Sequence, residues 1–518
     1  MSKSSGLVRS SMIFSGLTLV SRFMGLARDL VINAVMGASG NIAADAYATA
    51  LQFPNLFRRI FAEGAFTAAF VPAYAAVLEQ EGQDAADRLA RSALATISLM
   101  AIIFCVVAQI FMPQIMAAFS YGYADDPNKM RLTVILTQIT MPYLPCMTIV
   151  ALLSGVLNAL GRFVLSALAP TLLNLFMLAF VWFAPDPVEA ACSASWAVVA
   201  AGVAQVLLLI WGARRSGAKI SLTLPSLSPE IRSLLKLAVP GALAASATQI
   251  NVFVSSILAS GINGARAWLN AADRLYQLPL GLVGVAIGVA LLPALSRAVQ
   301  AGDSERSQNV MDEAVIFSMA LTLPAAAAII AMPFFLIDGL FTRGEFVTYD
   351  AQMTASALLH YGWGVPAFVL ARILAPAFFA RRDTFGPMKF ALVSVVINVV
   401  LGVSLFPLIG VAGLAIATST AAWINVLLMG FSLYRRKVWV PGKAAQTGLF
   451  KIGLSGGLMG LFCGLCAFYR LPLTAFILGS KEIAVVMVCF AGLLLYIGFL
   501  FLTRAVRPAD ITRALKRG

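Results

Sequence analysis

The sequence predicts an all-α membrane protein with fourteen transmembrane helices. Hydrophobic residues make up 60% of the 518 residues and charged residues only 12%, about half the charged fraction of a soluble chain. Apolar stretches of roughly 20 residues, the length that crosses a bilayer, recur along the whole chain. No large soluble domain interrupts them. No small-residue cleavage site follows the first stretch, so we expect no signal peptide.

The expected helices follow one another through short loops. Their approximate spans are residues 10–36, 46–77, 93–117, 132–160, 164–184, 193–212, 234–260, 267–295, 312–337, 352–379, 387–408, 411–433, 449–469 and 483–503. The longest hydrophilic connection, residues 212–232, separates the first six spans from the next six. Its LPSLSPEIRSLLKLA segment, which leads into the seventh span, predicts an amphipathic piece on the cytoplasmic surface.

The basic residues predict the orientation. Of the 37 lysines and arginines, 25 fall in the termini and even-numbered loops and six in the odd-numbered loops. Because cytoplasmic loops are enriched in Lys and Arg, this bias predicts that both termini are cytoplasmic. The net charge of +14 is then explained by topology, and we expect no nucleic-acid partner.

Metal and cofactor sites are not expected. The single histidine, His360, has no partners for a metal site, and Cys463 and Cys466 form a CxxC without a second pair. Packing is the favoured role for these cysteines. Because no Walker A motif occurs, ATP is not expected as a direct energy source.

An internal repeat predicts the domain division. An Ala-Ala-Asp unit ends at Asp45 near the start of the second span and recurs, ending at Asp273, in the eighth. The two copies lie six spans apart, so the halves should share one orientation. We therefore expect an N-terminal lobe at residues 1–215 and a C-terminal lobe at 216–437. Spans thirteen and fourteen with a cytoplasmic tail would occupy 438–518.

Charged side chains inside the spans are the strongest functional signal. Each costs about 2.5–3.5 kcal/mol at the bilayer centre, so they should face water, pair with one another, or snorkel to an interface. The arginines are Arg22, Arg28, Arg58, Arg59, Arg274 and Arg372, and the acids are Asp29, Glu63 and Asp273. Their excess positive charge predicts a central cavity for an anion, since guanidinium suits phosphate.

The first span carries the segment SRFMGLARD, which begins at Ser21. On a helix Arg22 and Asp29 share a face, while Arg28 lies about 120° round. Gly25 falls between the arginines, where a ligand could approach the backbone. The alternative is that Asp29 simply neutralises one arginine.

The second span contains Pro54-Asn55 followed by two arginines. Glu63 lies four residues after Arg59, so these two are expected to pair, which leaves Arg58 without a local partner. Pro54 predicts a kink or a half-helix, either as a hinge or as a static bend.

In the eighth span, Asp273-Arg274 precedes Gln277 and a stripe of glycines at positions 281, 284 and 288. The stripe either packs closely on another helix or leaves open space along the cavity.

These segments resemble the MurJ/MviN family of the multidrug/oligosaccharidyl-lipid/polysaccharide exporter superfamily. The matching motifs are SRFMGLARD, ADAY, FPNLFRRIFAEGAF, ADRLYQLPLGLVGVAIG and LAPAFFARRDTFGPM. The resemblance implies two six-helix lobes around a central cavity and a C-terminal helix pair with a lipid-facing groove. It also implies lipid II, an undecaprenyl-diphosphate-linked peptidoglycan precursor, as substrate.

The resemblance also implies roles for individual residues. Arg22, Arg28, Arg58 and Arg274 match the family's cavity arginines, Asp45 an essential acid, and Glu63 a cavity acid. Gln277 stands where some members carry an acid. Membrane potential or protons are expected to drive transport rather than sodium, because spans seven and eleven here lack the acids of sodium-binding members.

The resulting hypothesis is a flippase of the bacterial inner membrane, with membrane lipids and the cell-wall synthesis machinery as further partners. Alternatives are an exporter of another polyprenyl-linked glycan or a small anion on the same fold, and a polyprenyl-phosphate-processing enzyme. Because the acids are scattered, a transporter is favoured over an enzyme.

Overall fold

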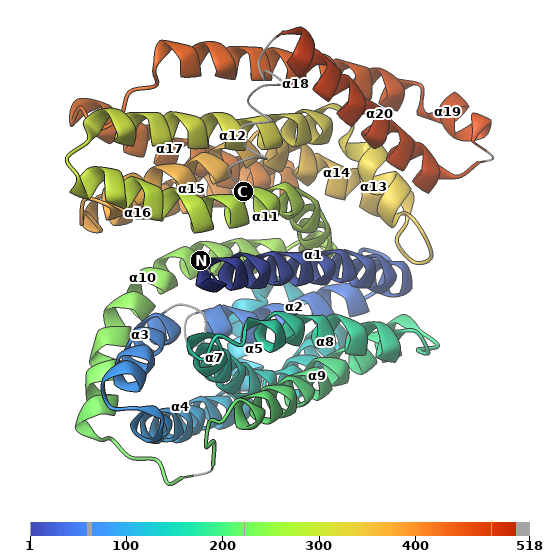
Figure 1. Ribbon diagram of the computed structural model, residues 1–518. Helices are drawn as coiled ribbons and strands as arrows, with labels where there is room; N and C mark the ends of the chain where they lie inside the picture. The colour runs from blue at the N-terminus through green and yellow to red at the C-terminus, as the bar shows by residue number, and fades with distance from the viewer. Residues whose placement is uncertain (1, 60–64, 222, 478, 504–518) are drawn as a thin grey trace. The chain divides into compact units, whose positions relative to one another are not determined.

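The computed structural model describes residues 2–59, 65–221, 223–477 and 479–503. Within these residues the regular structure consists of α-helices and one short 3-10 helix, without any strand (Figure 1). The prediction of an all-α protein is confirmed. Every expected span is met by one long helix or by two consecutive shorter ones.

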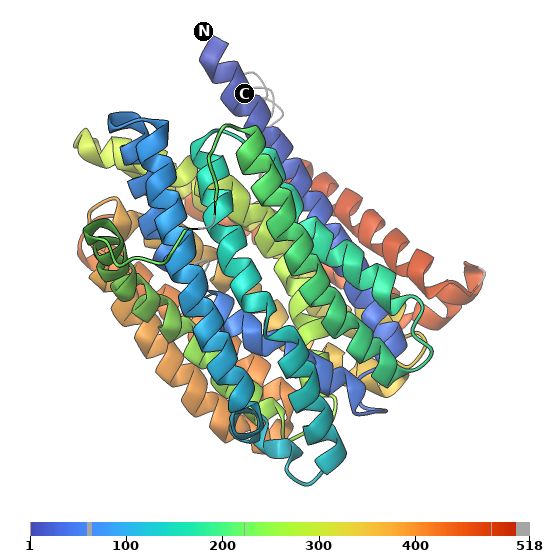
Figure 2. The same cartoon turned by 90° about the horizontal axis from the view of Figure 1, so that it is seen from below.

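The chain folds into two compact units. Unit 1 contains Met1–Ala267 and the short segment Arg343–Phe346. Its helices are α1 (Ser2–Met36), α2 (Ala43–Arg58), α3 (Ala65–Gln80), α4 (Gln83–Ile110), α5 (Met112–Phe119), α6 (Pro127–Thr140), α7 (Tyr143–Ala159), α8 (Phe163–Val181), α9 (Pro187–Arg215) and α10 (Pro229–Ala259), with the 3-10 turn η2 (Tyr121–Tyr123). Figure 2 shows α9 running beside α8 in this unit.

Unit 2 contains Trp268–Thr342 and Val347–Gly518. Its helices are α11 (Ala265–Gln300), α12 (Ser304–Ala331), α13 (Pro333–Phe341), α14 (Thr348–Gly362), α15 (Val365–Phe379), α16 (Phe385–Ile409), α17 (Val411–Arg435), α18 (Lys443–Phe468), α19 (Arg470–Phe476) and α20 (Lys481–Leu502). The last two long helices, α18 and α20, pack on each other and on α12. The division of the chain into residues 1–215, 216–437 and 438–518 stays a prediction.

Ten spans among the described residues are long and apolar enough to cross a membrane. The four expected spans outside this set correspond to α1, α2 with α3, α10, and α11, which are all helical. The chain is therefore a multi-pass membrane protein, and the count of fourteen stays a prediction.

Prolines divide several spans into two helices. Pro113 and Pro333 occupy the first turns of α5 and α13, where a missing backbone N–H costs nothing. Pro142 precedes α7 and Pro366 lies in the first turn of α15. From the sequence, each of these spans is expected to be one continuous helix, because apolar residues continue on both sides of the proline.

The connector between α9 and α10 is an extended strap. Residues 224–227 are not helical, and the following segment forms the start of α10. In this start Ile231 and Leu234 are buried while Arg232 and Lys236 are exposed, the pattern expected of an amphipathic piece. The buried Asp87 of α4 accepts the backbone N–H of Lys219 at 2.8 Å, and Thr96 Oγ1 donates to the Ser226 carbonyl at 3.0 Å. These contacts fix the strap along α4.

Candidate functional site

Arg28 is a residue of α1 whose side chain points towards α8, and it is 7% exposed. Its Nε and Nη2 donate to Asp29 Oδ1 at 2.9 and 2.6 Å, and its Nη1 donates to Asn174 Oδ1 at 3.0 Å. Asn174 Nδ2 in turn donates to the carbonyl of Ser21 at 3.0 Å. A buried arginine is tolerated here because a carboxylate and an amide accept three of its five N–H donors.

The acid of the first span therefore neutralises the arginine beside it. The Asp29 side chain contacts Arg28, its immediate neighbour, and the expected shared face of Asp29 and Arg22 stays a prediction. Arg22 and Ser21 are partly buried and Gly25 is buried.

Arg58 has a local partner that the sequence interpretation missed. Its Nε donates to Asn55 Oδ1 at 3.0 Å, three residues earlier on α2, a spacing that brings side chains together on a helix. The helix continues through Pro54 and ends at Arg58. Arg59 is exposed, and the expected pairing of Arg59 with Glu63 falls outside the described residues.

The corresponding polar residues of unit 2 lie on α11. Asp273 and Arg274 are partly buried, and Gln277 Nε2 donates to Asp273 Oδ2 one turn away. The Tyr276 ring packs against the Tyr361 ring of α14 in a tilted arrangement, with ring centroids 4.7 Å apart. Gln277 therefore orients the Asp273 carboxylate. Arg372 of α15 is exposed, and its snorkelling to an interface stays a prediction.

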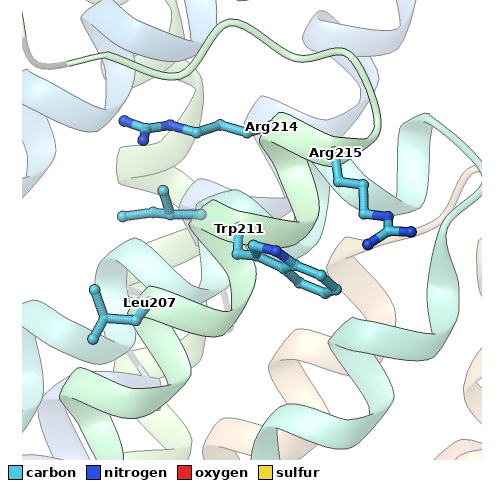
Figure 3. Close-up of a pocket in the computed structure, with 5 residues that line it drawn as sticks. Leu207, Trp211, Arg214 and Arg215 are labelled. Atoms are coloured by element: carbon cyan, nitrogen blue, oxygen red, sulfur yellow. The ribbon is translucent and has the colours of Figure 1, made fainter.

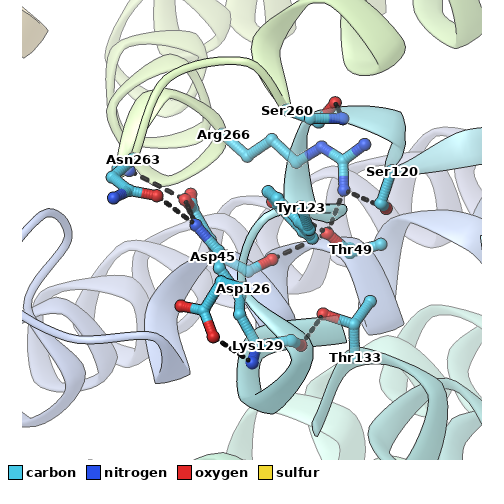
Figure 4. Close-up of polar contacts among 12 residues, drawn as sticks. Asp45, Thr49, Ser120, Tyr123, Asp126, Lys129, Thr133, Ser260, Asn263 and Arg266 are labelled. Carbon is cyan, nitrogen blue, oxygen red and sulfur yellow. Dashed lines mark hydrogen bonds and ion pairs between the residues drawn. The ribbon is translucent and has the colours of Figure 1, made fainter. Parts of the chain in front are cut away.

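Asp45 forms a buried ion pair that the sequence did not reveal. Its Oδ2 accepts from Lys129 Nζ at 2.6 Å and from the Gly264 backbone N–H at 2.7 Å (Figure 4). Lys129 Nζ also donates to Asn263 Oδ1 at 2.9 Å and lies 4.1 Å from the centre of the Tyr123 ring. The pair thus ties the starts of α2 and α6 to the loop after α10.

Arg266 lies beside this ion pair and is 2% exposed. Its Nη2 donates to the carbonyls of Phe119 and Ser256 at 2.7 and 2.8 Å, and its Nη1 donates to Ser120 Oγ at 2.8 Å and to Thr49 (Figure 4). The guanidinium therefore bonds to two carbonyls and two hydroxyls of buried residues, which satisfies its own buried donors.

Within unit 1 the structure brings Ser21, Arg28 and Asp29 together through Asn174. It also brings Arg58 into contact with Asn55. Asp45 belongs to a separate cluster with Lys129 and Arg266. From the sequence alone, Lys129 and Arg266 are assigned only to the loop charges that set the topology. The sequence signal that could have predicted this cluster is Asp45, because an acid among apolar residues needs a nearby cation.

Comparison with known proteins gives concordant results. A family model described as "Lipid II flippase MurJ" matches residues 32–487. The chain is 36% identical over 519 residues to the probable lipid II flippase MurJ of Rhizobium meliloti (strain 1021), covering 99% of this chain and 97% of the relative. It is 39% identical over 461 residues to the probable lipid II flippase MurJ of Rhizobium tropici, covering 88% and 86%.

Solved structures show the same fold. A structure titled "Lipid II flippase MurJ, inward closed conformation" superposes with a TM-score of 0.78 at 24% identity, covering 95% of this chain and 99% of that one. An inward-facing multidrug resistance transporter of the MATE family, in the MOP superfamily, superposes with a TM-score of 0.66 at 16% identity, covering 82% and 99%.

Proposed function

Because the chain belongs to the MurJ family of lipid II flippases, we propose that it moves lipid II from the cytoplasmic to the periplasmic leaflet of a bacterial inner membrane. The observation that carries this proposal is the match to flippase relatives along almost the whole chain. The charge bias of the loops supports cytoplasmic termini. In this role the chain is a transporter and not an enzyme.

The proposed mechanism is alternating access. Arg22, Arg28, Arg58 and Arg274 bind the diphosphate, for which guanidinium groups are suited by charge and by paired donors. The sugar–peptide head group crosses within the protein while the polyprenyl tail stays in lipid along α18 and α20. Asp45 contributes to gating at the periplasmic end. Asp29, Asn55 and Gln277 orient the charged side chains that they contact.

Complementation of a flippase-depleted strain tests the function. The wild-type gene should restore growth, whereas Arg28→Ala and Arg274→Ala should not, although both proteins reach the membrane. Arg372→Gln is the matched control, since it removes an exposed arginine to which no substrate role is given. Growth supported equally by all three variants would contradict the proposal.

Substrate identity is tested by competition with purified lipids. Lipid II should displace a labelled lipid II from the purified protein, and an O-antigen precursor that shares the polyprenyl diphosphate should compete less well. Equal competition would indicate a broader polyprenyl-diphosphate exporter.

A further inference from the structure

The end of α9 that carries Arg214 and Arg215 has a surface hollow that the proposed transport mechanism does not use. It is lined by Leu207, Ile210, Trp211, Arg214 and Arg215 (Figure 3). We propose that this hollow binds an anionic phospholipid of the surrounding membrane, with the phosphate at the arginines and an acyl chain along α9.

An apolar stripe leads along α9 to the hollow. Val203, Leu207 and Trp211 recur every four residues and are 47%, 62% and 53% exposed. Side chains at this spacing lie on one face of a helix, and Trp196 continues the face in the other direction at 57% exposed. In a membrane-spanning helix such a face contacts acyl chains.

The stripe ends in two cations. Arg215, four residues after Trp211, places its guanidinium 5.3 Å from the centre of the indole ring. Figure 3 shows Arg214 leaving the helix on the other side, so that the two guanidinium groups flank the hollow. A tryptophan beside basic residues at the end of a span is typical of the headgroup region.

These arginines are not committed to an acid elsewhere. Among the described residues no carboxylate lies within ion-pairing distance of either side chain, and Arg214 makes one bond, from Nε to the Ile220 carbonyl at 3.3 Å. The last carbonyls of α9 are capped instead by the backbone N–H groups of Ser216, Gly217 and Ala218. The terminal guanidinium nitrogens can therefore donate to a phosphate.

The two ends of α9 differ in charge, which selects one leaflet. The helix begins after Asp186, whose side chain caps the first turn, and Glu189 follows within that turn. An anionic headgroup would be repelled there and attracted to the arginine end, where each basic residue adds roughly fivefold to binding of an anionic lipid.

Quenching of Trp211 fluorescence tests the proposal on the full-length protein in bilayers. The bilayers consist of brominated phosphatidylcholine, which quenches tryptophan, with increasing fractions of unbrominated phosphatidylglycerol. Subtracting the signal of Trp211→Phe isolates the response of this site. Phosphatidylglycerol should displace the quencher at least roughly fivefold more strongly than unbrominated phosphatidylcholine.

The variant R214Q/R215Q should lose this preference. R435Q/R436Q is the matched control, because it removes two adjacent arginines from the end of α17, where Arg436 is paired with Asp383 at 2.6 Å. Preserved preference in the control with loss in R214Q/R215Q supports the site. An equal loss in both variants, the absence of a preference in the wild type, or displacement of the lipid by inorganic phosphate would overturn it. Because no transport is measured, the result is independent of the flippase assignment.

Discussion

At the scale of single residues, Lys129 and Asp45 form an ion pair in which the side chains are only 2% and 1% exposed. Charges in such a position stabilise a fold only while both are present, because either one alone is a desolvated charge. The cluster around them includes Asn263 and the Gly264 backbone N–H, so the loop after α10 depends on the same pair.

We predict that Lys129→Met destabilises the protein by about 3–5 kcal/mol, since it leaves the Asp45 carboxylate buried without a cation. Thermal unfolding of the purified protein measures the effect. The double variant D45N/K129M should recover part of the loss. Lys481→Met is the control, because the Lys481–Asp338 pair is partly exposed, with a 46% exposed lysine, and should contribute about 0–1 kcal/mol. Equal effects of the two lysine variants would contradict the prediction.

The geometry around Arg28 predicts that charge alone is insufficient at this position. Its three guanidinium nitrogens donate to Asp29, Asn174 and the Met177 sulfur, and a lysine ammonium cannot reproduce that fork. Arg28→Lys should therefore fail to restore growth of a flippase-depleted strain when its membrane level equals that of the wild type. Full growth with Arg28→Lys would show that only the positive charge matters.

At the scale of elements, the strap between α9 and α10 is held by the buried Asp87 on α4. The carboxylate accepts the Lys219 backbone N–H and the Gln83 side chain, both at 2.8 Å. A neighbouring acid, Asp84, is exposed and pairs with the Lys219 side chain at 2.7 Å. The two acids therefore share Lys219 as a partner but differ in burial.

We predict that Asp87→Ala releases the strap and that Asp84→Ala does not. Losing a buried acceptor leaves the Lys219 N–H without a partner, at a cost of about 1–3 kcal/mol, whereas an exposed ion pair contributes little. Limited trypsin digestion at Arg214, Arg215 and Lys219 reports the release, and cleavage should be faster in Asp87→Ala. Equal acceleration in both variants would show that burial is not decisive.

Helix positions followed well from the sequence, and helix breaks did not. Apolar stretches of about 20 residues predict where α8, α9, α16 and α17 lie, because the thickness of the bilayer fixes the length of a spanning helix. Pro113 and Pro333, however, divide spans at helix starts. A proline in an apolar stretch can equally lie within a helix, as Pro54 does, so residue type alone does not distinguish a break from a bend.

At the scale of the whole molecule, the fold class and the family followed from composition and motifs, while the partners of the charged residues required the structure. Arg28 with Asp29 is a contact between neighbours, yet Lys129 reaches Asp45 across 84 residues. Long-range pairs depend on how helices pack, and a single sequence contains no direct signal for this. The sequence therefore identified the charged residues within the spans but not all of their partners, and their functional role stays a prediction.

Translocation of lipid II by the purified chain in proteoliposomes tests the central claim most directly. Labelled lipid II should become accessible on the opposite leaflet far faster than in empty liposomes, and Arg28→Ala and Arg274→Ala should remove the increase while Arg372→Gln retains it. Imposed voltage, proton or sodium gradients identify the driving force in the same vesicles. A wild-type rate equal to that of empty liposomes, or one unaffected by either arginine variant, would contradict the account.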